Sequence, residues 1–129
     1  MCPLPTMIPR QATLNDVPTL MAIEKRCWKP HLQATEDTIR ERIMRYPQGQ
    51  YVIELDSIVH GVLYTQRIRD VEEMIACGFS KQASMFDAGG EYLQLLAINV
   101  PSPLGTSYLI RQFFFEVPKT NSYIFPRWF

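Results

Sequence analysis

Cysteine is scarce in this sequence. Only three of its 129 residues are cysteines, Cys2, Cys27 and Cys77, and no two of them form a Cys-x-x-Cys pair. Thiols so few and so scattered argue against a disulfide framework and against a zinc site. We therefore expect structural thiols and no bound metal.

Long apolar runs and an excess of one charge are also missing. No stretch approaches the ~20 apolar residues of a membrane span, and the opening residues MCPLPTMIPR contain no signal-peptide core. Thirteen Lys and Arg residues balance thirteen Asp and Glu residues, so no global field attracts nucleic acid or a membrane surface. These absences predict a protein of the cytoplasm, or of an organelle that the sequence does not identify, with neither kind of partner.

The composition that remains is that of an ordinary globular domain. Hydrophobic residues make up 47% of the chain and charged residues 20%, which argues against disorder. A chain of this length forms one domain at most and can bury ~65–70% of its unfolded surface. Residues 1–129 are therefore interpreted as a single domain.

The first part of the chain predicts a short strand and a helix. Met7–Ala12 has strand character but is interrupted by Pro9, which places it at a sheet edge. The following stretch LNDVPTLMAIEKRCW has apolar residues at helical spacing, with Asn15 as the expected N-cap. On this helix we expect Glu24 to face outward.

The stretch TEDTIRERIMRYP predicts a second helix. Thr35 is the expected cap, acidic residues favour its positive end, and Pro47 stops it. Arg40, Arg42 and Arg45 are interpreted as a solvated face rather than as a phosphate clamp.

The stretch QYVIELDSIVHGVLYTQRI gives the strongest hairpin pattern in the chain. Two β-branched and aromatic runs flank the turn-forming pair Asp56-Ser57, and Gly61 in the second run indicates a bulge or a close backbone approach. A short helix is expected over Val71–Cys77, ended by Gly78.

The last part of the chain predicts a central strand and a further helix. Tyr92–Val100 is almost continuously apolar, as is typical of a strand covered on both faces. Thr106–Phe115 is a helix candidate, and Ser122–Phe125 has strand character. The fold class predicted from this order is α/β, with a mixed central sheet flanked by helices.

Several of these stretches resemble the GNAT superfamily of acyl-CoA-dependent N-acyltransferases, over roughly residues 7–115. IPRQATLNDVPTLMAIE is similar to its opening strand and helix, YVIELDSIVHGVLY to its second and third strands, and LLAINVPSPLG to its fourth strand and acyl-CoA loop. The words RCW, HGVLYTQRI and LQLLAINV most resemble the GNAT-like domains of polyketide synthase loading modules.

This resemblance implies acetyl-CoA or another acyl-CoA as the bound substrate. A helix N-terminus suits the pyrophosphate of coenzyme A, and a strand edge suits the amides of its pantetheine arm. The residues implied for the arm are Ile98, Asn99 and Val100, and those implied for the phosphates are Gly105, Thr106 and Ser107.

Two departures from the family pattern qualify that implication. Only four residues, two of them prolines without an N–H, separate Val100 from Gly105, where the family has a longer Gly-rich loop. Losing two hydrogen bonds to a charged group would weaken pyrophosphate binding by roughly a hundred-fold or more. The chain also ends before the family's usual C-terminal strands, so we expect an incomplete GNAT-like domain.

The catalytic residues stay unknown at this point. Glu54 and Tyr108 are weak candidates for a base and an acid, and Glu54 is better explained as a solvent-facing strand carboxylate. Neither His31 nor His60 matches the family's histidine, which belongs to the part of the fold beyond this chain.

Two aromatic residues are the implied substrate pocket. Trp28 resembles a tryptophan that lines the acyl pocket of the loading-module relatives, and a core role explains it as well. Tyr64, together with Thr65, ends the third strand where an acceptor would sit, and packing between strands is the alternative.

Three functions compete on this basis. The first is a GNAT-type acyltransferase that moves an acyl group from acyl-CoA to an amine or a carrier-protein thiol. The second is a non-catalytic GNAT-like module that pairs with another chain through the aromatic C-terminal stretch FFFEVPKTNSYIFPRWF. An unrelated α+β binding domain is the third.

Overall fold

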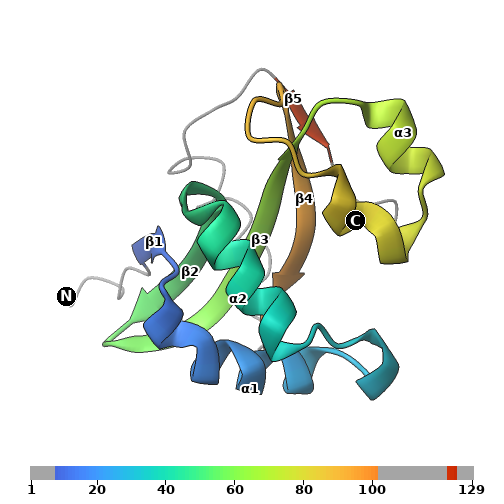
Figure 1. Ribbon diagram of the computed structural model, residues 1–129. Helices are drawn as coiled ribbons and strands as arrows, with labels where there is room; N and C mark the ends of the chain where they lie inside the picture. Colours follow the sequence, from blue (N-terminus) through green and yellow to red (C-terminus); the bar gives the residue numbers. More distant parts are fainter. Residues whose placement is uncertain (1–7, 102–121, 125–129) are drawn as a thin grey trace.

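A mixed sheet forms the centre of the molecule (Figure 1). The computed structural model describes residues 8–101 and 122–124, and within them the sheet has five strands in the order β1-β2-β3-β4-β5. The first four strands pair antiparallel, and β5 is parallel to β4. The strands are β1 (Ile8–Gln11), β2 (Gln50–Leu55), β3 (Ile58–Ile68), β4 (Tyr92–Asn99) and β5 (Ser122–Ile124).

Two helices cover one face of this sheet, and a third segment connects β3 to β4 (Figure 1). The helices are α1 (Val17–Cys27), α2 (Glu36–Arg45) and α3 (Val71–Ala76), and a 3₁₀ segment, Phe79–Met85, follows α3. The α/β class with a mixed sheet and flanking helices is therefore confirmed. The prediction that residues 106–115 form a helix lies outside the described residues.

The start of α1 differs from the prediction in one residue. Asn15 is exposed, whereas the Asp16 carboxylate accepts a hydrogen bond from the Thr13 N–H at 2.8 Å in a 3₁₀ turn before the helix. The same carboxylate accepts two bonds of 2.9 Å from the guanidinium of Arg10 on β1. The predicted N-cap was wrong because the 3₁₀ turn extends to Asp16, which is the N-cap of α1, and its carboxylate is bound to Thr13 and Arg10 rather than to the helix.

The second helix follows the local sequence closely. Its predicted cap is confirmed, because the Thr35 hydroxyl accepts a hydrogen bond from the Thr38 N–H at 3.1 Å. The helix ends at Arg45, two residues before Pro47. This end is expected because proline has no N–H to donate to the preceding turn.

The hairpin is also confirmed. Asp56 and Ser57 adopt positive φ angles of 52° and 65°, the conformation that a two-residue turn between twisted strands requires. Ile53 pairs with Gly61 and Glu54 with Val59, which leaves one extra residue on β3 and forms the bulge expected near Gly61.

A second bulge, which the sequence did not predict, interrupts the pairing of β3 with β4. Tyr64 pairs with Ala97 and Thr65 with Leu95, so Leu96 is the extra residue. A bulge leaves its extra residue without a place in the ladder and bends the strand. This bend lies in the middle of β4, under the two helices.

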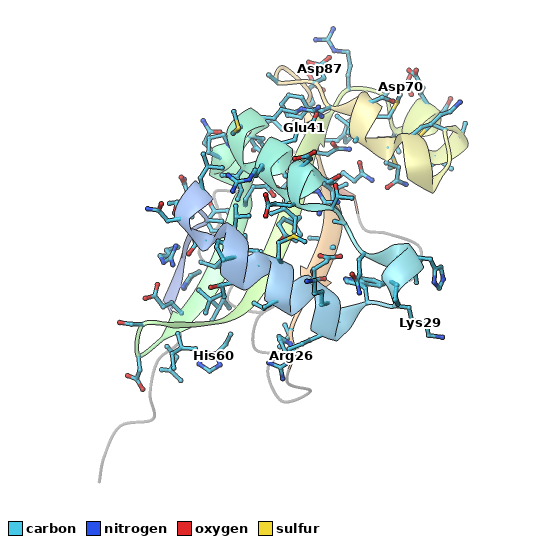
Figure 2. All side chains as sticks on the ribbon, turned by 60° about the horizontal axis from the view of Figure 1, so that its bottom comes forward. Arg26, Lys29, Glu41, His60, Asp70 and Asp87 are labelled. Atoms are coloured by element: carbon cyan, nitrogen blue, oxygen red, sulfur yellow. The ribbon has the colours of Figure 1, made fainter. Side chains whose placement is uncertain are left out.

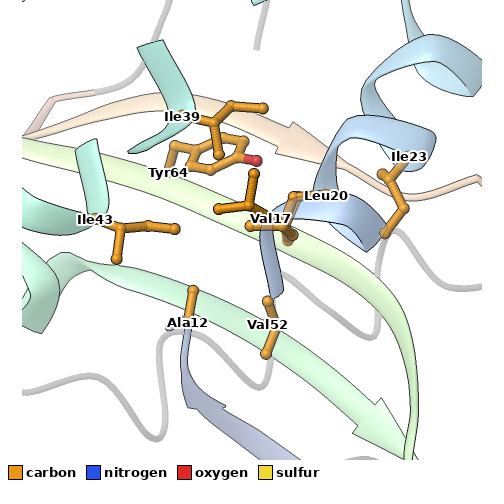
Figure 3. Close-up of a cluster of buried hydrophobic side chains, with 9 residues drawn as sticks. Ala12, Val17, Leu20, Ile23, Ile39, Ile43, Val52 and Tyr64 are labelled. Carbon is orange, nitrogen blue, oxygen red and sulfur yellow. The ribbon is translucent and has the colours of Figure 1, made fainter. Parts of the chain in front are cut away.

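The main core lies between the helices and the sheet (Figure 3). It joins the apolar stripes predicted on both helices to residues of β2 and β3, and its members are Ala12, Val17, Leu20, Ile23, Ile39, Ile43, Val52, Val62 and Tyr64. Each fully buried aliphatic side chain contributes about 1.5–3 kcal/mol relative to exposure. This packing fixes α1 and α2 over the bulged part of the sheet.

Candidate functional site

A cavity of about 670 Å³ opens between the two helices and the bulged strands. Its size lies within the range of small-molecule sites. Its walls come from the end of α1, the connection to α2, α2 itself, the 3₁₀ segment and the middle of β3 and β4. The apolar members of the wall include Trp28, Leu32, Ala34, Phe86, Leu96 and Ala97.

A buried polar network forms one side of this cavity. The Glu24 carboxylate accepts hydrogen bonds from the side-chain amide of Asn99 and from the N–H of Ala34, each at 2.9 Å. The Asn99 carbonyl oxygen in turn accepts a bond of 2.8 Å from the indole N–H of Trp28. Glu24 is therefore buried, and the expectation that it faces outward was wrong.

The signal that could have corrected this expectation is the spacing of α1. Glu24 stands four residues after Leu20, and residues at i and i+4 share one helix face. A carboxylate can be buried on that face because each of its two oxygens accepts a hydrogen bond. These two hydrogen bonds make Glu24 a fixed part of the cavity wall, and the network sets the position of the Trp28 ring.

Arg42 lies on the opposite side of the cavity. Its guanidinium carbon is 4.7 Å from the centroid of the Tyr64 ring, a cation–π contact. Burial lowers the pKa of Arg42, although the nearby Glu24 and Tyr64 act in the opposite direction. The interpretation of Arg42 as part of a solvated face was wrong, because the helix turns this arginine inward over the sheet.

The 3₁₀ segment after α3 closes another side of the cavity. Arg45 donates a hydrogen bond of 2.9 Å to the carbonyl oxygen of Ala83, lies 5.1 Å from the centroid of the Phe86 ring and pairs with Glu41. Buried glutamines hold the segment from beneath, with Gln66 and Gln94 joined at 2.7 Å and Gln94 joined to Gln82 at 3.0 Å.

The edge of β4 next to the cavity is only partly paired. β5 is in register with Tyr92–Gln94, and within the described residues no strand pairs with Leu95–Asn99 on that side. An unpaired strand edge can add an extended ligand that carries amide groups. The bulge at Leu96 lies at the boundary between the paired and the unpaired stretch.

Solved structures share this arrangement. One is the GphF GNAT-like decarboxylase in complex with isobutyryl-CoA, which is 30% identical in sequence to this chain. The match covers 81% of this chain and 55% of the GphF chain, with a TM-score of 0.74. Another is the loading GNATL domain of CurA from Lyngbya majuscula, which is 28% identical in sequence. Here the match covers 84% of this chain and 56% of the CurA chain, with a TM-score of 0.76. The fold is GNAT-like. The predicted resemblance to the GNAT-like domains of polyketide synthase loading modules is confirmed.

This GNAT-like chain spans about half the length of the two solved chains that it matches. No model of a protein family matches the sequence, and no curated protein matches it.

The GNAT-like fold places the residues predicted for the pantetheine arm at the end of β4. Ile98 and Asn99 pair with β3 on one side, while Val100 follows the strand. Their main-chain role stays a prediction, and Asn99 has an additional side-chain role that the sequence did not indicate. Gly105, Thr106 and Ser107, the shortened loop around them and Tyr108 lie outside the described residues.

The two predicted pocket residues have different positions. Trp28 is half-buried and lines the cavity. Thr65, which is fully buried, also lines it. Tyr64 is fully buried in the core and is not one of the lining residues, whereas Arg42, whose guanidinium lies over its ring, is one. Its role in a substrate pocket stays a prediction.

The remaining candidates are distributed over the molecule. Glu54 forms an ion pair with Arg10 beside the β1–β2 pairing, which agrees with the structural interpretation of this carboxylate. His31 is exposed and lines the cavity, whereas His60 lies beside the hairpin turn, far from Asp87 at the other end of the molecule (Figure 2).

Two further features concern the described part of the chain alone. Within it, no cluster of three or more His, Cys, Asp or Glu side chains could hold a metal ion. No helix there is long and apolar enough to cross a membrane.

Proposed function

We propose that this chain is the acyl-CoA-binding part of a GNAT-like loading domain. In this proposal the domain takes a carboxylated acyl-CoA, releases CO₂ and transfers the remaining acyl group to a carrier-protein thiol. The observation that carries the proposal is the cavity of about 670 Å³ beside the stretch of the β4 edge that no described strand pairs with, in a chain 30% identical to a GNAT-like decarboxylase.

The geometry supports a defined orientation of the substrate. The pantetheine arm carries amides that can pair with the edge at Leu95–Asn99, as an additional strand would. The thioester would then lie near the bulge at Leu96, where the backbone is free of the regular ladder. From there the acyl end reaches the cavity between Trp28 and Ala97.

The chemistry needs two steps. In the first, the bond between the carboxylate carbon and the α-carbon breaks, its electron pair forms the thioester enolate, and the α-carbon takes up a proton. In the second, the carrier thiolate attacks the acyl carbonyl and the coenzyme A thiolate leaves. The apolar part of the wall favours the first step because the negative charge passes from a localised carboxylate to an enolate, in which it is delocalised and needs less solvation.

Among the acceptors, a carrier-protein thiol is preferred to an amine. A loading domain delivers an acyl group to a carrier, and one of the matched structures is described as a loading domain. The non-catalytic module is not favoured, since the other matched structure is described as a decarboxylase.

Isothermal titration of this chain with acetyl-CoA and malonyl-CoA tests the binding part of the proposal and should show dissociation constants below 1 mM, roughly −4 kcal/mol or tighter. Mass spectrometry tests the reaction on the complete domain: malonyl-CoA incubated with that domain and a holo carrier protein should yield acetyl-CoA and acetylated carrier. Absence of binding at millimolar ligand would remove the proposed function.

A cavity-filling variant adds a control. Ala97→Phe places a ring in the cavity and should abolish acyl-CoA binding, while Ala88→Phe on an exposed loop should not. Circular dichroism of both variants establishes that they fold. Equal binding by the two folded variants would show that the ligand lies elsewhere.

A further inference from the structure

Arg42 has hydrogen-bonding capacity that the described part of the chain leaves unused. Its guanidinium stacks on the Tyr64 ring, yet among the described residues it forms no hydrogen bond and no ion pair. A guanidinium carries five N–H donors. A half-buried charge with all of these unused is uncommon, because removing it from water costs free energy that partners normally offset.

The other charged groups of the cavity wall already have partners. Arg45 is paired with Glu41 and also donates to a backbone carbonyl. Both oxygens of Glu24 accept bonds from uncharged N–H groups. Glu24 therefore acts on the positive charge of Arg42 electrostatically, but it accepts no hydrogen bond from the Arg42 guanidinium within the described residues.

Arg42 and the bulge of β4 border the same cavity. Tyr64, on which the guanidinium stacks, pairs with Ala97, the residue that follows the bulged Leu96. Arg42 and Leu96 both line the cavity. The unused donors therefore face the space where the proposed function places the acyl end of the substrate.

We propose that Arg42 binds the free carboxylate of a malonyl-type acyl-CoA and selects such substrates over simple acyl-CoAs. This inference rests on the proposed function and adds the residue that determines its specificity. The planar guanidinium can hold a carboxylate through two parallel hydrogen bonds, a geometry that the stacked Tyr64 ring preserves.

A phosphate of coenzyme A is the other anion that a guanidinium could bind. The cavity wall also contains the carboxylates of Glu24 and Glu41, which oppose a multiply charged group more than a single carboxylate. The acyl carboxylate is therefore the ligand that fits, and free coenzyme A serves as the probe for the alternative.

The experiment compares three ligands and three proteins by isothermal titration. The ligands are malonyl-CoA, acetyl-CoA and free coenzyme A, and the proteins are the unmodified chain, Arg42→Gln and Arg40→Gln. Arg40 lies on the same helix and pairs with Glu36 on the exposed face, so its variant is the matched control.

The unmodified chain should bind malonyl-CoA about 10- to 100-fold more tightly than acetyl-CoA, the factor that charge-assisted hydrogen bonds supply. Arg42→Gln should remove this preference and leave the affinities for acetyl-CoA and coenzyme A unchanged. Arg40→Gln should retain the preference. Should Arg42→Gln fail to fold, Arg42→Lys, which retains the charge but not the planar fork, should show a reduced preference.

Each contrary result has a distinct meaning. Equal affinity of the unmodified chain for malonyl-CoA and acetyl-CoA would overturn this inference alone. A loss of affinity of Arg42→Gln for free coenzyme A would assign Arg42 to the phosphates and would also overturn it. Absence of binding of all three ligands would overturn the proposed function and this inference together.

Discussion

The side-chain amide of Asn99 at the end of β4 donates a hydrogen bond of 2.9 Å to the carboxylate of Glu24 on α1, 75 residues earlier in the chain. The bond joins the first helix to the strand that borders the cavity. Because Asn99 also accepts a bond from Trp28, one side chain fixes the helix, the strand end and the indole ring. The stability and the shape of the cavity are therefore coupled.

The first prediction concerns this network. Glu24→Gln replaces one acceptor oxygen with an NH₂ group, which then faces either the Ala34 N–H or the Asn99 amide and leaves a buried donor unpaired. We expect a loss of about 1–3 kcal/mol in the free energy of unfolding, measured by urea denaturation. Glu36→Gln, on the exposed face of α2, is the control and should cost at most about 1 kcal/mol, through its ion pair with Arg40 and the helix dipole. Similar losses in both variants would show that the network adds little.

The second prediction concerns the hydroxyl of Tyr64. This oxygen is buried and has no hydrogen-bond partner within the described residues. Tyr64→Phe removes it and keeps the ring under Arg42, so the free energy of unfolding near pH 7 should be unchanged or higher. A loss above about 1 kcal/mol would indicate a partner for the hydroxyl.

The same tyrosine predicts a pH dependence. Burial raises the pKa of Tyr64 above its usual value of about 10, because the phenolate is poorly solvated in the core. Above about pH 10 the unfolded chain ionises this group and the folded chain does not, so stability falls as pH rises. Between pH 10 and 11 the unmodified chain should lose stability faster than Tyr64→Phe, measured by urea denaturation at each pH. Parallel curves would contradict the assignment.

The third prediction concerns acid stability. The Arg10 guanidinium lowers the pKa of Asp16, so this carboxylate binds protons less readily in the folded chain than in the unfolded chain. Its contribution is present above about pH 4 and is lost as pH falls through the lowered pKa. Asp16→Asn should cost about 1–3 kcal/mol at pH 7 and should weaken the acid dependence.

The control for this variant is Asp37→Asn, an exposed position in the first turn of α2. It should change stability by about 0.3–1 kcal/mol through the helix dipole only. Thermal unfolding followed at pH 7, 4 and 3 compares the two variants. An acid dependence that Asp16→Asn leaves unchanged would contradict the role given to this ion pair.

The fourth prediction compares two neighbouring glycines. A Cβ on Gly90 would come within 2.3 Å of the Ile68 carbonyl oxygen, whereas a Cβ on Gly89 would meet only side-chain atoms at 3.5 Å. Gly90→Ala should therefore cost about 1–3 kcal/mol or more, and Gly89→Ala should be neutral or slightly stabilising. Urea denaturation of the two variants gives the comparison. Equal stability would mean that the backbone there shifts freely.

Local features of the chain were predictable from the sequence because the interactions behind them are local. Thr35 caps α2 through a residue three positions away, and the Asp56-Ser57 turn needs only its own two φ angles. The edge position of β1 follows in the same way from Pro9, which lacks an N–H.

The candidate site was less predictable because its members meet only after folding. Three arginines of α2 have similar local sequence, yet Arg42 alone stacks on Tyr64, since the sheet and not the helix supplies that ring. Leu96 becomes a bulge because of how β3 and β4 align, a property of two strands separated by α3 and the 3₁₀ segment.

The sequence by itself determined the cap and the end of α2, the hairpin, the apolar stripes and the words that resemble the GNAT superfamily, since each depends on residues a few positions apart. Only the tertiary structure decided that Glu24 and Arg42 face a common cavity rather than water. The physical reason is that the burial of a charge depends on donors and rings supplied from elsewhere in the chain, and these are in place only when the sheet and both helices have packed.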